Sequence, residues 1–139
     1  MRRIFLFIML MSLLGCANTD YRFEHLEGDK STVLPLKFDG IYGVRDGALV
    51  TGEARFNDGA DTVTVNMMLF LRPPAEFRSG TYQGVLGGKT ISGSVECPSL
   101  TFLGGQTALP DVGGLFILKD EQGRPAFRVR IPATTLKRR

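Results

Sequence analysis

The sequence predicts an all-β protein, a single antiparallel β-sandwich or small β-barrel of about eight or nine short strands after a flexible N-terminal tether. Three observations predict this fold. Turn-forming residues recur about every 8 to 12 residues in the later part of the chain, a spacing typical of such proteins. Several segments between these turns alternate apolar and polar side chains. No segment from residue 33 onward has the long period of an amphipathic helix.

The turns divide the chain into strands. Asp46-Gly47 is a two-residue hairpin signal, because both positions favour positive φ. Gly87-Gly88 is a second signal of the same kind. Further turns are expected at residues 57–59 and 121–123. The expected strands are residues 33–38, 41–44, 48–56, 61–71, 81–86, 89–96, 99–103, 115–119 and 126–131.

Alternation within these strands predicts which side chains enter the core. In residues 126–131, the apolar side chains should face inward and Arg128 and Arg130 outward. The strand at residues 61–71 turns apolar on both faces near its end. A strand that is apolar on both faces is covered on both faces, so the tether, a loop or a partner is expected over Met68 and Phe70.

The first fifteen residues have the plan of an export signal. Arg2 and Arg3 precede an apolar run over residues 4–14, and Gly15 lies directly before Cys16. A helix needs roughly 20 residues to cross a bilayer, so this run is too short to span one and suits a cleavable leader.

Leu13-Leu14-Gly15-Cys16 resembles the lipobox of the bacterial lipoprotein class. The resemblance implies that Cys16 receives a diacylglyceryl group on sulfur, that signal peptidase II cuts before it, and that the new amine is acylated. Covalent lipid on Cys16 is therefore the expected modification, and it anchors the protein to a membrane. Ala17 stands where an aspartate would favour the inner membrane, which implies an outer-membrane anchor facing the periplasm.

This gives three expected parts: a signal peptide at residues 1–15, a lipidated N-terminus and tether at residues 16–32, and a single β domain at residues 33–139. The tether is assigned because residues 17–32 are polar, mixed in charge and weakly periodic. A short helical turn that packs Tyr21, Phe23 and Leu26 is the alternative.

Composition restricts the partners and the chemistry. The leader carries two of the 17 basic residues and none of the 14 acidic ones, so the mature chain is nearly neutral and nucleic acid is not expected as a partner. With Cys16 lipidated, Cys97 has no intramolecular disulfide partner and is expected to be a small buried side chain.

We expect no enzyme activity, metal or cofactor apart from the lipid. His25 is the only histidine and lies in the expected tether as a mobile surface residue, so a rigid nucleophile–base pair is not expected. One histidine and one cysteine cannot form a zinc site. Asp58 and Asp61 lack the spacing of a calcium loop and are interpreted as part of a plain turn.

Residues 73–80 are the first candidate for binding a partner. Two prolines stiffen this expected loop, which presents Phe77 and Arg78 near its tip. In the alternative interpretation, Phe77 packs into the core. The next candidate is a face formed by Arg55, Arg128 and Arg130.

The residues therefore favour a monomeric, membrane-anchored, non-catalytic module that binds a periplasmic protein, as an immunity or inhibitor protein or as a component of an envelope or secretion assembly. A lipocalin-like carrier of a small apolar ligand and an unrecognised cell-envelope hydrolase are the alternatives. An internal cavity of about 300 Å³ or more would favour the carrier.

Overall fold

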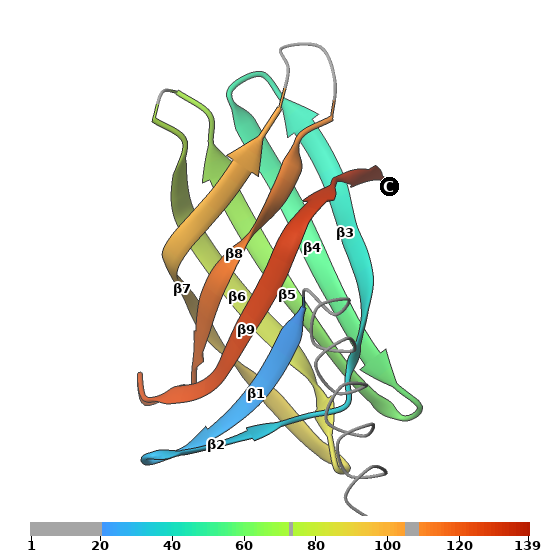
Figure 1. Ribbon diagram of the computed structural model, residues 1–139, viewed down its shortest axis with the longest axis vertical. Helices are drawn as coiled ribbons and strands as arrows, with labels where there is room; N and C mark the ends of the chain where they lie inside the picture. The colour runs from blue at the N-terminus through green and yellow to red at the C-terminus, as the bar shows by residue number, and fades with distance from the viewer. Residues whose placement is uncertain (1–20, 73, 105–108) are drawn as a thin grey trace, which may run out of the picture.

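The computed structural model describes residues 21–72, 74–104 and 109–139, and these form one curled ten-stranded sheet with the shape of a half-barrel (Figure 1). The all-β prediction is confirmed, and the described residues contain no helix. The strands are β1 (Arg22–Glu27), β2 (Lys30–Val33), β3 (Lys37–Asp46), β4 (Leu49–Asp58), β5 (Asp61–Phe70), β6 (Glu76–Leu86), β7 (Lys89–Leu103), β8 (Asp111–Lys119), β9 (Pro125–Thr135) and β10 (Lys137–Arg138).

The sheet is an antiparallel meander whose two ends are joined by the C-terminal segment. Strands β3 to β9 pair in chain order, β1 lies between β9 and β2, and the short β10 pairs in parallel with β3. Because β10 follows β9 directly, this segment pairs with β8 along the whole of β9, with β1 from Phe127 to Arg130, and with β3 at its end. In Figure 1, β7, β8 and β9 lie in front of β4, β5 and β6.

The turn predicted at Gly87-Gly88 is confirmed, whereas the turn predicted at Asp46-Gly47 lies one residue later, at Gly47-Ala48, because Asp46 is the last residue of β3 and pairs with Leu49. Gly47 (φ 59°) lies in the β3–β4 hairpin, and Gly87 and Gly88 (φ 58° and 78°) lie in the β6–β7 hairpin. Each conformation is one that side chains with a Cβ rarely adopt. Local turn chemistry therefore sets the register of these strand pairs.

The tether prediction is wrong for the described part of residues 16–32. Residues 22–27 and 30–33 are strands, and Phe23 is only 1% exposed. Its ring centroid lies 5.3 Å from that of Phe56 and 5.5 Å from that of Phe127. The domain therefore starts at or before Arg22, and His25 belongs to the sheet instead of a tether. Residues 1–20, with the predicted leader and Cys16, lie outside the described residues.

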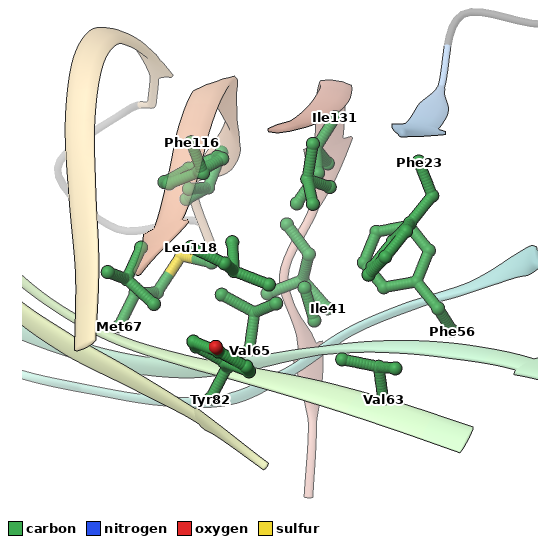
Figure 2. Close-up of a cluster of buried hydrophobic side chains, with 14 of the residues drawn as sticks. Phe23, Ile41, Phe56, Val63, Val65, Met67, Tyr82, Phe116, Leu118 and Ile131 are labelled. Carbon is green, nitrogen blue, oxygen red and sulfur yellow. The ribbon is translucent and has the colours of Figure 1, made fainter. Parts of the chain in front are cut away.

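Buried apolar side chains fill the space inside the curled sheet (Figure 2). The inward alternation predicted for residues 126–131 is confirmed, since Phe127, Val129 and Ile131 are at most 6% exposed. Rings and branched side chains from β1, β3, β4, β5, β6, β8 and β9 meet in this cluster. Its largest fully buried members are Phe23, Phe56, Phe116, Ile41, Leu69, Leu118 and Leu136.

Three further expectations are corrected. Residues 99–103 are not a separate strand, because β7 continues past Pro98 through a register shift between Glu96 and Ser99. Met68 remains 40% exposed, so neither a tether nor a loop of the described residues covers it, and a partner over it stays a prediction. The segment around Phe77 is the start of β6 and not the tip of a loop. Of the two prolines that precede it, Pro73 lies outside the described residues.

The ten strands that the structure describes lie between Arg22 and Arg138, and the described members of the buried core lie between Phe23 and Leu136. A chain that begins at Ala17 therefore contains all of the described sheet and core.

Candidate functional site

The sheet opens between β6 and β7. These strands pair only from Thr81 with Ser94 to Leu86 with Lys89. Beyond that point, residues 76–80 of β6 pair with β5 alone, and the rest of β7 pairs with β8 alone. Two strand edges thus diverge around a hollow of about 670 Å³, which we call the β6–β7 opening. Diverging edges leave backbone N–H and C=O groups without partners in the sheet.

The β6–β7 opening has an apolar floor and a charged rim. Phe77 is half-buried there, and its ring meets that of Phe116 edge to face, with centroids 6.1 Å apart. Lys119 Nζ lies 3.2 Å from Glu96 Oε2 on the rim. Arg78 is exposed on the same rim, 3.1 Å from Glu76 Oε1. An extended chain could meet apolar, acidic and basic side chains here.

Arg78 also covers an aromatic ring on the neighbouring strand. Its guanidinium carbon lies 5.2 Å from the ring centroid of Phe70, and that of Arg72 lies 5.4 Å from the same centroid. Two guanidinium groups against one ring are within the range of cation–π contacts. The two arginine side chains thus partly cover Phe70, whereas the sequence predicted a tether, a loop or a partner there.

Cys97 lies in the β6–β7 opening and is half-buried against the core, as expected for a small side chain. Its Sγ donates a hydrogen bond to the carbonyl oxygen of Ser99 over 3.3 Å. Burial raises the pKa of the Cys97 thiol from 9.0 to about 11, although this hydrogen bond acts in the opposite direction. The thiol is therefore neutral at neutral pH and a poor nucleophile.

A second hollow, of about 240 Å³, lies over the outer side of β8, β9 and β1. Its lining residues are Arg22, Glu24, Leu115, Arg128 and Arg130, and we call it the arginine hollow. Glu24 is only 5% exposed, because two arginines cover it. Arg22 Nε lies 2.8 Å from Glu24 Oε1, and Arg128 Nε donates to Glu24 Oε2 over 2.8 Å.

The three arginines proposed from sequence as one face belong to two local groups. Arg128 and Arg130 line the arginine hollow, whereas Arg55 lies on β4, five strands away from β9 in the strand order. Arg55 contacts Glu53 over 3.4 Å, and its guanidinium lies 4.3 Å from the ring centroid of Tyr42. Arg139 also pairs with Glu53.

A third hollow, an open apolar groove of about 410 Å³, lies at the end of the sheet that holds the β6–β7 hairpin. Leu34, Leu86, Ile91 and Phe127 are among its lining residues, with His25. The ring centroid of His25 lies 5.3 Å from that of Phe127. This ordered contact corrects the expectation of a mobile surface histidine.

Neither a metal site nor a membrane-crossing helix is found in residues 21–72, 74–104 and 109–139. No group of three histidine, cysteine, aspartate or glutamate side chains in this part of the chain is placed to hold a metal ion. Asp61, considered with Asp58 for calcium, instead accepts a hydrogen bond from the backbone N–H of Gly87 over 3.0 Å. No helix in the described part of the chain is long and apolar enough to cross a membrane.

Comparison of the chain with protein-family models, curated proteins and solved structures finds no match. No relative therefore bears on the function of this all-β chain.

Sequence reasoning named Phe77, Arg78, Arg128 and Arg130 but missed Arg22 and Glu24. The missed signal was the alternation in residues 22–26, where charged and aromatic side chains follow each other with the period of a strand.

Proposed function

We propose that this protein is a lipid-anchored, non-catalytic module of the bacterial cell envelope that binds an extended segment of another protein. The observation that carries the proposal is the β6–β7 opening, where two strand edges diverge beside Phe77 and Arg78. A partner strand that pairs with such an edge gains main-chain hydrogen bonds, and the side-chain hollows supply selectivity. The lipobox-like leader supports the anchor.

Several features of the opening support a peptide more than a small substrate. Its rim carries both charge signs, from Arg78, Lys119 and Glu96, which suits a chain with mixed side chains. Each added backbone hydrogen bond contributes about 0.5 to 1.5 kcal/mol. The half-buried ring of Phe77 gives the floor an apolar contact.

In-cell photocrosslinking tests this function. A photoreactive amino acid at Ser79, which is exposed and lines the opening, should give a discrete adduct with an envelope protein. The same amino acid at Thr62 is the matched control and should give no adduct. Thr62 is exposed near the start of β5, whereas Ser79 pairs with Met68 near the end of that strand.

Once the partner is known, Arg78→Ala should weaken binding roughly thirtyfold, as expected for a hot spot. Identical adducts from both positions, or none from Ser79, would contradict the proposal.

The open apolar groove favours a second candidate, a carrier of a small apolar ligand. Its volume of about 410 Å³ exceeds the roughly 300 Å³ that such ligands need. However, the groove is open at one end of a filled core, whereas a lipocalin-like carrier would enclose its ligand. Saturable binding of a fluorescent fatty acid, reduced by Ile91→Gln and unchanged by Arg78→Ala, would support the carrier over the peptide-binding module.

A further inference from the structure

We infer that the arginine hollow docks onto the phosphate groups of an anionic lipid surface. This inference rests on the lipid anchor of the proposed function and adds to it the face that the domain turns toward the membrane. Two guanidinium groups, those of Arg22 and Arg128, contact the Glu24 carboxylate, and Arg130 lines the same hollow, so its lining carries three positive charges and one negative charge.

The strand register brings two of these positive charges close together, which destabilises the sheet unless an anion binds. Arg22 on β1 lies directly opposite Arg130 on β9 in the antiparallel pair. Like charges in directly opposed positions destabilise a sheet. Glu24 offsets part of this repulsion through Arg22 and Arg128, but the described residues offer no ion pair to Arg130. An external anion bound near Arg130 and Arg22 would remove the remaining repulsion.

The arginine hollow lies close in the chain to the predicted anchor, so we expect the anion to be a lipid headgroup. Arg22 follows Cys16 by six residues, which reach at most about 20 Å when fully extended. A lipid on Cys16 would therefore let the arginine hollow contact the headgroup layer directly, and direct contact is needed because salt largely screens exposed charges that are farther apart than a Debye length of about 8 Å. Guanidinium groups suit this role, because their planar array of donors matches the oxygen atoms of a phosphate.

The local character of the charge matters, because the whole domain is nearly neutral. Without the leader, the 15 remaining basic residues almost balance the 14 acidic ones. General attraction to an anionic surface is therefore weak. Binding that depends on Arg22 and Arg130 would identify a specific face of the domain.

Vesicle flotation of the chain that begins at Ala17 tests the inference, because this chain lacks both leader and Cys16. It should float with vesicles of equal parts phosphatidylcholine and phosphatidylglycerol but not with phosphatidylcholine alone. Arg130→Gln should reduce the partition coefficient roughly fivefold, the equivalent of about 1 kcal/mol per basic residue at an anionic surface, and adding Arg22→Gln should reduce it further. Arg78→Gln, which removes the same charge from the rim of the β6–β7 opening, is the control and should float like the wild type.

Equal flotation with both kinds of vesicle, or an equal loss in Arg78→Gln and Arg130→Gln, would overturn the inference. Saturable binding of inorganic phosphate without flotation would also overturn it, because the hollow would then be a site for a soluble anion. The outcome is distinguishable from a failure of the proposed function. Loss of the Ser79 crosslink or of lipid on Cys16 would leave this flotation result unchanged.

Discussion

Phe23 on β1 and Phe56 on β4 meet edge to face, with ring centroids 5.3 Å apart and an interplanar angle of 66°. The two strands are not neighbours in the sheet, so this contact crosses the interior of the half-barrel. The N-terminal strand is therefore part of the core.

Phe23→Ala is expected to lower the free energy of unfolding by about 3 to 5 kcal/mol, because it removes a fully buried ring and leaves a cavity. Urea unfolding of the chain that begins at Ala17 measures this. Glu27→Ala, at the exposed end of the same strand, is the control and should change stability by about 0.5 kcal/mol or less. If Phe23→Ala were as stable as the wild type, residues 22–27 would act as a tether in solution.

Phe77→Ala separates a packing role from a binding role. The ring is half-buried against Phe116, so its loss should lower stability by about 2 kcal/mol. Arg78→Ala should leave the melting temperature almost unchanged, because exposed ion pairs such as that with Glu76 contribute little. Should Phe77→Ala melt like the wild type and lose the crosslinked partner, Phe77 would be a binding residue with no packing role.

Cys97 should react slowly with alkylating agents in the folded protein. The chain that begins at Ala17 contains no other cysteine, so its labelling reports this thiol alone. The pKa of this thiol is about 11 in the folded protein and 9.0 without burial. At pH about 8, the thiolate fraction in the folded protein is therefore roughly a hundredfold lower than in the unfolded chain. Iodoacetamide labelling in native buffer and in denaturant measures the ratio, and equal rates would contradict the shift.

The same shift gives a pH dependence of stability. Folding favours the neutral thiol, so its contribution is fully present below pH 9 and is lost as the pH rises from 9 toward 11. Cys97→Ser should flatten this part of the stability profile. Denaturant melts of both proteins across that range test the sign, and a steeper decline in Cys97→Ser would contradict it.

The places of the turns were predictable from sequence to within about one residue, because Gly47, Gly87 and Gly88 adopt the positive φ that these hairpins need. The role of residues 22–27 was not predictable, because β9, with which β1 pairs, lies about a hundred residues later in the chain. Glu24 illustrates the difficulty. A carboxylate in the sequence predicts an exposed side chain, because carboxylates are rarely buried without a partner. The partner of Glu24 is Arg128, which becomes its neighbour only in the folded sheet.

The β6–β7 opening could be predicted only in part. Two prolines before Phe77 indicated a loop, yet β6 begins at Glu76, two residues after Pro74. Pro98 indicated the end of a strand, yet β7 passes through it with a register shift. Proline removes one backbone donor, which bends or interrupts pairing without ending the strand. The divergence of the two edges depends on how both strands pair with their other neighbours.

The lipid anchor is the prediction on which the membrane location depends. Cells that express the full chain and are fed an alkyne-tagged fatty acid should label the wild-type protein, because a lipobox at residues 13–16 would direct acylation to Cys16. Cys16→Ser should carry no label and should retain the unprocessed leader. Cys97→Ser is the matched control, since it removes the other cysteine and should label like the wild type.

A single acyl chain binds a membrane only marginally and two or three bind it stably, so the wild type should also remain in the membrane fraction after a high-salt wash. Label on Cys16→Ser, or its loss in Cys97→Ser, would show that the leader is not of the lipoprotein class.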